Sequence, residues 1–165
     1  MPAALEPRSA YIALGANLGD PPGQLRCALR QLAAEPAIRV TAVSNFYRSA
    51  PMGPAGQPDY CNAVCAIWTK LPADALLNLL HIIERRAGRV RDVRWGPRVL
   101  DLDLLHVDGV TSGSADLTLP HPHLHERNFV LVPFAEIAPE LTLPGLGGLA
   151  ALAAACDRAG LGPWD

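Results

Sequence analysis

Two aspartates in a short apolar segment have the residue type and the spacing for chemistry. Asp101 and Asp103 alternate with three leucines between positions 100 and 104. In a strand the leucines would face the core, and both carboxylates would share one surface. Like charges this close repel each other unless a cation neutralises them, and oxygen ligands on a rigid strand suit one or two Mg²⁺ ions. The alternatives are a solvated strand face, and aspartates that pair with nearby arginines.

A cluster of arginines leads directly into these two aspartates. Residues 85–98 contain six arginines and one aspartate, which is a net charge of +5. A solvated charge run is the usual interpretation of such a segment. Here Gly88, Gly96 and Pro97 predict a loop that ends where the aspartates begin, and arginines beside paired carboxylates suit a polyphosphate with its metal ions. The chain has no G-x-x-x-x-G-K-[ST] motif, so arginines and metal rather than a P-loop would hold a nucleotide.

A third group of side chains could recognise a flat heterocycle. Asn62 lies in an alternating segment, and its amide can both donate to and accept from the polar edge of such a ring. Tyr60, Trp95 and Phe129 could stack on the face of the ring. The alternative for Asn62 is an ordinary polar group on the surface of a strand.

Three histidines alternate directly before an arginine, at His121, His123, His125 and Arg127. A zinc site is conceivable, but Pro122 disfavours a regular strand or helix there, and no cysteine is near in the sequence. We therefore prefer the interpretation that a histidine beside Arg127 donates to phosphate.

Composition restricts the class of protein. The 165 residues suit a single domain, and the 50% of apolar residues can form a sizeable core. The formal charge of −2 argues against a general binder of nucleic acid or of anionic membranes. No apolar run reaches the roughly 18 residues of a membrane span, and neither a signal peptide nor a C-x-x-C pair is present. We expect a soluble cytoplasmic monomer, with no nucleic acid or membrane as partner, whose four cysteines are packing residues.

Hydrophobic periodicity predicts the elements that position these side chains. An α+β fold is expected, with the order β-α-β-β-α-β of a ferredoxin-like antiparallel sheet. Both helices of this pattern would lie on one side of the sheet, and a helical C-terminal appendage would follow. The expected strands are 11–14, 38–47, 60–69 and 99–107, with a short return strand at 117–119. The first helix should begin at Pro21, after the cap Asp20, and the second at Pro72. Turns or loops are expected at 15–19, 48–59 and 108–109.

Six segments, in order along the chain, together resemble the 6-hydroxymethyl-7,8-dihydropterin pyrophosphokinase family of folate biosynthesis. The most specific of them is R-W-G-P-R-x-x-D-x-D at residues 94–103. The others are residues 11–20, 57–63, 88–91, 117–122 and 136–141. The resemblance runs from about Tyr11 to Leu141, and we expect residues 1–165 to form one pyrophosphokinase domain.

The resemblance implies that diphosphate passes from MgATP to the hydroxymethyl oxygen of 6-hydroxymethyl-7,8-dihydropterin, with release of AMP. It implies two Mg²⁺ ions on Asp101 and Asp103, and catalytic roles for Arg89 and Arg98 in assembling the transferring phosphates. Nucleotide contacts are implied for Glu84, Arg91, Arg94, Thr118, His121 and Arg127. Substrate contacts are implied for Ser49, Ala50, Met52, Tyr60, Asn62, Trp95 and Phe129, with the pterin ring between Trp95 and Phe129.

Four positions depart from the commonest pattern of this family: Ala16, Ser49, Asp116 and His123. Asp116 stands where some members carry an arginine directed toward ATP, and His123 where an arginine is common. None of the four removes a metal ligand that the resemblance implies. Two other functions are a non-catalytic regulator that binds ATP or pterin, and a ferredoxin-like RNA-binding module. An aromatic content of 5% and the paired aspartates argue against the RNA-binding module.

Overall fold

An antiparallel sheet forms the centre of the protein. The computed structural model describes residues 6–51, 55–88 and 99–164. The central strands are β1 (Arg8–Ala16) and β4 (Tyr60–Thr69), and β5 (Asp101–Val107) pairs with the other side of β1. β2 (Ile38–Val43) and β3 (Tyr47–Ser49) pair one after the other with the far side of β4. This strand order is that of a ferredoxin-like sheet, so the predicted α+β fold is confirmed.

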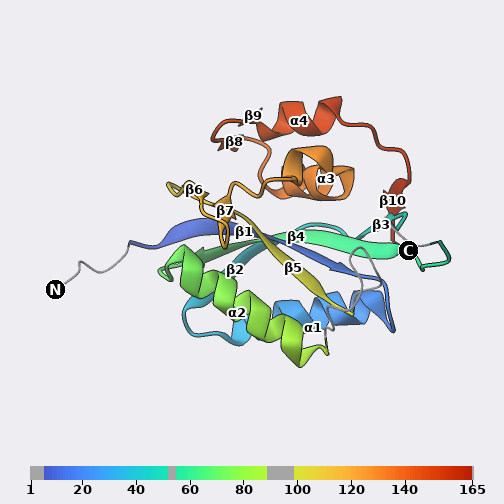
Figure 1. Ribbon diagram of the computed structural model, residues 1–165, viewed down its shortest axis with the longest axis horizontal. Coiled ribbons are helices and arrows are strands. Elements are labelled where there is room, and N and C mark those ends of the chain that lie inside the picture. The colour runs from blue at the N-terminus through green and yellow to red at the C-terminus, as the bar shows by residue number, and fades with distance from the viewer. Residues whose placement is uncertain (1–5, 52–54, 89–98, 165) are drawn as a thin grey trace.

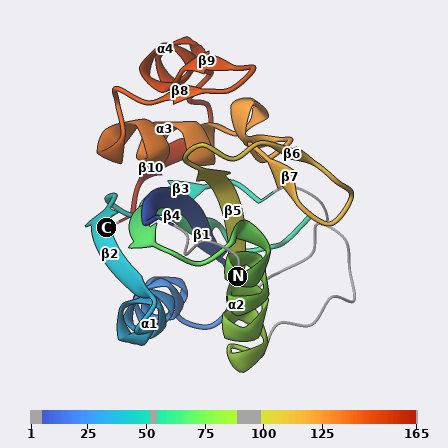
Figure 2. The same ribbon diagram turned by 90° about the vertical axis from the view of Figure 1, so that its left-hand side faces the viewer.

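Two helices cover one face of the sheet, as Figures 1 and 2 show. α1 (Pro21–Ala34) begins at the expected cap, where Asp20 Oδ1 accepts a hydrogen bond from Gly23 N at 3.3 Å. α2 (Ala73–Arg86) follows Pro72 and ends before Gly88. The backbone at Gly88 has a φ of 84°, a conformation that glycine adopts much more easily than other residues. The core between helices and sheet consists of alternate strand residues and the apolar helix faces, including Ile12, Leu14, Leu25, Leu32, Cys61, Cys65, Ile67, Leu76, Leu80 and Ile83.

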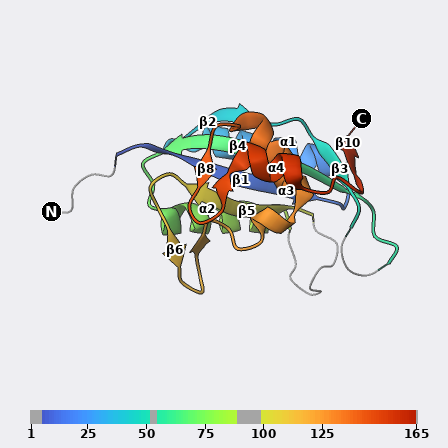
Figure 3. The ribbon, with the colours of Figure 1, turned by 90° about the horizontal axis from the view of Figure 1, so that it is seen from above.

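The C-terminal helices cover the opposite face of the sheet (Figures 2 and 3). α3 (Asn128–Ile137) lies against β4, and α4 (Leu149–Ala155) packs on α3. A second core forms there from the other side chains of the same strands, among them Tyr11, Ala13, Val64, Ala66 and Leu105, around the fully buried Phe134. The predicted C-terminal appendage is therefore the third layer of the fold, and β4 is buried on both of its faces.

Several short elements complete the chain and shape its surface. They are the pair β6 (Ser112–Gly113) and β7 (Thr118–Leu119), the single turn η1 (Leu124–Glu126), the pair β8 (Thr142–Leu143) and β9 (Gly147–Gly148), and β10 (Leu161–Pro163). β10 pairs with β3 and extends the main sheet at that edge. Among the described residues, no helix has both the length and the apolar character that crossing a membrane requires.

Four local expectations were wrong. β1 continues through Gly15 to Ala16, where a turn was expected. The strand expected over 38–47 is interrupted because Ser44 leaves the ladder: its hydroxyl accepts a hydrogen bond from Val64 N at 2.9 Å, while Ser44 N donates to Val64 O. The strand resumes as β3, which occupies the first residues of the expected loop. Cys27 is exposed on α1 and is not a packing residue.

Candidate active site

The register of three strands brings two candidate residues into one row across the sheet. Gly15 of β1 pairs with Asn62 of β4 on one side and with Asp101 of β5 on the other. Asp103 lies one row further along, opposite Ala13. Paired residues of antiparallel strands point to the same face, and here it is the face that carries α3. A Cβ atom at position 15 would lie 3.4 Å from Asn62 Oδ1, so glycine at this position leaves the space beside the Asn62 amide free of a side chain.

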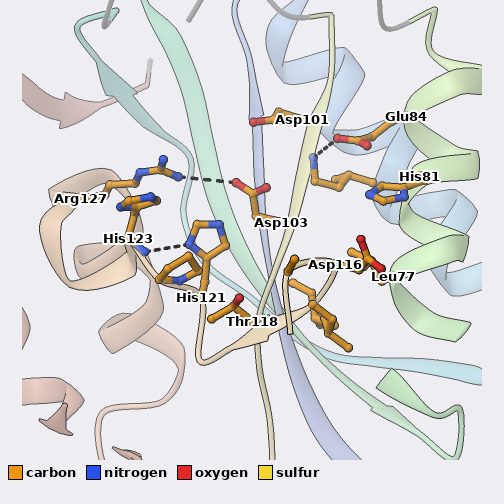
Figure 4. Close-up of a pocket in the computed structure, with 15 residues that line it drawn as sticks. Leu77, His81, Glu84, Asp101, Asp103, Asp116, Thr118, His121, His123 and Arg127 are labelled. Carbon is orange, nitrogen blue, oxygen red and sulfur yellow. Dashed lines mark hydrogen bonds and ion pairs between the residues drawn. The ribbon is translucent and has the colours of Figure 1, made fainter. Parts of the chain in front are cut away.

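A first cleft, of about 360 Å³, opens at the β5 edge of the sheet. Its walls come from α2, β5, the β6–β7 hairpin and segment 121–127 (Figure 4). The predicted metal and nucleotide residues that the structure describes all line this cleft: Glu84, Asp101, Asp103, Thr118, His121 and Arg127. The fold thus brings together side chains that are up to 43 positions apart in the sequence.

The acidic and basic groups of the first cleft contact one another directly. Arg127 Nη1 lies 3.8 Å from Asp103 Oδ2. His121 Nδ1 accepts a hydrogen bond from His123 N at 3.2 Å, so a neutral His121 ring carries its proton on Nε2. Burial, reinforced by the positive charge of Arg127, lowers the pKa of His121 to about 4. At neutral pH, His121 is therefore an uncharged hydrogen-bond donor in this cleft.

Glu84 makes a backbone contact that the sequence did not reveal. It lies on α2, is 1% exposed, and its Oε2 accepts a hydrogen bond from Leu102 N at 2.9 Å. Leu102 stands between the two aspartates, and Figure 4 shows this contact at the wall of the cleft. Glu84 therefore holds the backbone of β5 at the point from which both carboxylates project.

A second cleft, of about 440 Å³, lies between β3, the start of α3 and the C-terminal segment. Ser49, Ala50 and Phe129 line it, and they are three of the predicted substrate residues. Asn62 Nδ2 donates to Ser49 Oγ at 2.6 Å, and both side chains are buried. Tyr60 pairs with Ser49 in the strand register, and Arg127 lines both clefts. The metal and nucleotide candidates thus gather in one cleft. Of the described substrate candidates, Ser49, Ala50 and Phe129 line the other cleft, and Asn62 and Tyr60 adjoin it through Ser49.

Comparison with known families shows what kind of protein has this arrangement. Residues 11–139 match the model of the 7,8-dihydro-6-hydroxymethylpterin-pyrophosphokinase (HPPK) family. The chain belongs to this family. The 2-amino-4-hydroxy-6-hydroxymethyldihydropteridine pyrophosphokinase of Pseudomonas aeruginosa is 46% identical over 151 residues, which are 92% of this chain and 93% of that protein. The enzyme of the same name from Methylorubrum extorquens is 48% identical over 136 residues, 82% of this chain and 86% of its own length.

Solved structures share the fold. The HPPK-DHPS protein of Plasmodium falciparum, crystallised with pteroate, superposes with a TM-score of 0.70 over 93% of this chain at 12% identity. This chain spans about 43% of the length of that longer protein. As a member of the HPPK family, the chain is an ATP-binding transferase of folate biosynthesis: it moves the pyrophosphoryl group of ATP to hydroxymethyldihydropterin.

Several residues that the family resemblance implicates lie outside the described part of the chain. They are Met52, Arg89, Arg91, Arg94, Trp95 and Arg98. Their predicted roles remain predictions. The structure in turn adds three residues to the walls of the two clefts. His81 and Leu77 of α2 line the first cleft, and Asn128 lines the second. Spacing on α2 could have indicated His81, which lies one turn before Glu84.

The donor set of the first cleft suits a hard divalent cation. Asp101 and Asp103 present carboxylate oxygens from a rigid strand, and both are only half-buried. Among the residues that the structure describes, no three or more His, Cys, Asp or Glu side chains gather as a metal site. Two carboxylates leave most positions around Mg²⁺ for water and for phosphate oxygens. This donor set therefore fits a metal that binds together with a nucleotide.

Proposed function

We propose that the first cleft binds ATP with two Mg²⁺ ions, and that the second cleft binds the pterin. The observation that carries this assignment is the position of Arg127, which lines both clefts and lies 3.8 Å from Asp103. A cation at this junction can stabilise the negative charge that develops on the phosphates as the transfer proceeds. The transferred group would then pass from one cleft to the other beside Arg127.

In this proposal Asp101 and Asp103 would hold the metal ions, whose positive charge would neutralise the phosphate oxygens of ATP. His121 contributes a neutral Nε2–H donor toward a phosphate oxygen. Thr118 contributes a hydroxyl from β7 at the nucleotide wall of the cleft. Arg89 and Arg98 assemble the transferring phosphates, and Arg91 and Arg94 contact the nucleotide, as the family resemblance implies.

The pterin contacts that we propose come from the second cleft and from Asn62 and Tyr60, which adjoin it through Ser49. Asn62 presents an amide whose Nδ2 is held by Ser49 Oγ, so its orientation is set before the substrate arrives. A buried amide that is already oriented suits the donor and acceptor edge of a pterin ring. Tyr60 and Phe129 supply aromatic surface, with Trp95 as the predicted partner of Phe129 on the other face of the ring.

We expect the enzyme to work as a cytoplasmic monomer.

The chemical step has a defined product. The hydroxymethyl oxygen attacks the β-phosphorus of ATP and loses its proton to water as the O–P bond forms. The bond between the β-phosphorus and the α,β-bridging oxygen breaks to release AMP. The experiment incubates the pure protein with MgATP and 6-hydroxymethyl-7,8-dihydropterin and separates the nucleotides. AMP that forms only when the pterin is present supports the proposal. ADP as the sole nucleotide product contradicts it, and folded protein without any turnover indicates a regulator.

Matched variants test the metal ligands. Asp103→Asn keeps the shape of the side chain but removes the charge, so turnover should fall by about a hundredfold or more, and a higher Mg²⁺ concentration should be needed. Asp74→Asn makes the same change at an exposed position in the first turn of α2 and should leave turnover within about twofold. Full activity of Asp103→Asn at limiting Mg²⁺ would exclude Asp103 as a ligand.

A further inference from the structure

We propose that the C-terminal strap, residues 156–164, is part of the pterin site, and that Asn128 is the positioning residue that holds it there. The strap connects the two walls of the second cleft, one built by β3 and the other by the start of α3 (Figures 1 and 3). This inference rests on the assignment of the second cleft to the pterin. It concerns residues at the very end of the fold, beyond the segments that resemble the family.

The strap first holds the wall that carries Ser49 and Ala50. β10 pairs with β3, and Leu161 lies opposite Ser49 in the register. Ala50 N donates a hydrogen bond to Gly160 O at 3.2 Å. Gly160 adopts a φ of 75°, and a Cβ atom there would lie 3.5 Å from Ala50 Cβ. The backbone of this wall is therefore fixed by the strap, and glycine permits the turn that brings the two segments together.

Asn128 attaches the strap to the other wall. It is the first residue of α3, and its neighbours Arg127 and Phe129 both line the second cleft. Asn128 Nδ2 donates to Asp157 O at 2.9 Å and to Ala159 O at 3.1 Å. Both hydrogens of this amide are thus used to hold one loop of the strap. No other residue type of this size offers two such donors from one atom without adding a charge.

The far end of the strap has an anchor of its own. The Arg48 guanidinium lies 3.9 Å above the ring of Trp164, and Trp164 N donates to Phe46 O at 3.0 Å. The strap is therefore fixed by Asn128 near its start and by the contacts of Trp164 at its end. The strap residues that line the second cleft lie near the first of these anchors: Cys156, Asp157, Ala159 and Gly160. Loosening either anchor changes the spacing between Ala50 and Phe129.

The consequence is specific to one substrate. None of the described residues that line the first cleft belongs to the strap. Removing the Asn128 amide should therefore weaken pterin binding while ATP binding is largely kept. Asn128→Ala should raise the KM for the pterin about tenfold, which corresponds to the loss of roughly one net hydrogen bond. The KM for ATP and kcat should both stay within about threefold of the unsubstituted enzyme.

The experiment measures both KM values, kcat and the thermal midpoint for five proteins: the unsubstituted full chain, Asn128→Ala, Trp164→Ala, the double variant and a control. Asn78→Ala is the matched control, because Asn78 is an exposed asparagine on α2 that lines neither cleft. The control should behave like the unsubstituted enzyme. Because both anchors act through one strap, the double variant should show much less than the product of the two single effects on the pterin KM.

Two results would overturn the inference. One is an unchanged pterin KM in Asn128→Ala with a lowered midpoint, which would make the contact purely structural. The other is an equal rise in both KM values. If Asn128→Ala does not fold, Trp164→Ala alone must show the selective rise in pterin KM. Failure of the second-cleft assignment has a different appearance: Phe129→Ala, which removes a side chain that lines this cleft outside the strap, would then also leave the pterin KM unchanged.

Discussion

Replacement of Glu84 by alanine should destabilise the protein and disturb the metal site at the same time. The carboxylate is 1% exposed and accepts a hydrogen bond from Leu102 N at 2.9 Å. A hydrogen bond contributes about 0.5–1.5 kcal/mol, and alanine would also leave a buried N–H without its acceptor, which costs about 1–3 kcal/mol. We therefore expect the free energy of unfolding to fall by about 2–3 kcal/mol. For a chain of this length the midpoint of thermal unfolding should drop by about 4–10 °C.

Equilibrium unfolding in urea, with far-ultraviolet circular dichroism as the signal, measures this loss. Glu84→Gln keeps a carbonyl oxygen where Oε2 accepts from Leu102 N, so it should lose clearly less stability than Glu84→Ala. Glu140→Ala, at an exposed position beyond α3, is the control and should change stability by about 0.5 kcal/mol or less. Because Leu102 lies between Asp101 and Asp103, Glu84→Ala should also raise the Mg²⁺ concentration at half-maximal activity.

An unfolding free energy of Glu84→Ala that equals that of Glu140→Ala would show that the contact with Leu102 contributes nothing. The position of β5 would then have to be set by its pairing with β1 alone. A large loss of stability with an unchanged Mg²⁺ requirement would separate the two effects. In that case the carboxylate would support the fold without orienting the aspartates.

Two further predictions concern titration and thiol reactivity. Burial and the charge of Arg127 lower the pKa of His121 from 6.5 to about 4, so the unfolded chain takes up this proton at a higher pH than the folded chain does. The free energy of unfolding should therefore fall as the pH is lowered from about 6.5 to 4, and His121→Gln should make this fall less steep. An equally steep fall in His121→Gln would contradict the lowered pKa of His121. Burial raises the pKa values of Cys61 and Cys65 to about 12, whereas Cys27 is exposed, so a thiol reagent should modify Cys27 rapidly in the native protein. The Cys27→Ser variant should lack this fast phase, and rapid labelling of Cys61 or Cys65 would be inconsistent with the core.

The parts of the molecule that the sequence predicted are those with a strong local pattern. The strand Tyr60–Thr69 was predicted with its correct bounds, because small apolar residues alternate through it and a proline precedes it nearby. The alternation around Asp101 and Asp103 placed both carboxylates on one face, and the structure confirms that placement in the first cleft. Asp20 and Pro21 likewise identified the start of α1.

The parts that could not be predicted depend on contacts between distant segments. Leu161–Pro163 carries no strand propensity, and its pairing with Tyr47–Ser49 spans more than a hundred residues. The same holds for the third layer, because periodicity shows that a helix has an apolar face but does not show which face of the sheet it covers. Ser44 replaces a ladder contact with a side-chain contact, which alternation of residue types does not reveal.

The most direct measurement follows the two terminal phosphates of ATP into the pterin product. The pure protein is given hydroxymethyldihydropterin and Mg²⁺ with ATP labelled either at the β- or at the γ-phosphate, and the label in the isolated pterin product is counted. Transfer of a pyrophosphoryl group across the junction at Arg127 predicts that both labels enter the product in equal amounts, and that one AMP is released for each molecule of pterin product. Label from the γ-position alone, together with ADP, would contradict it.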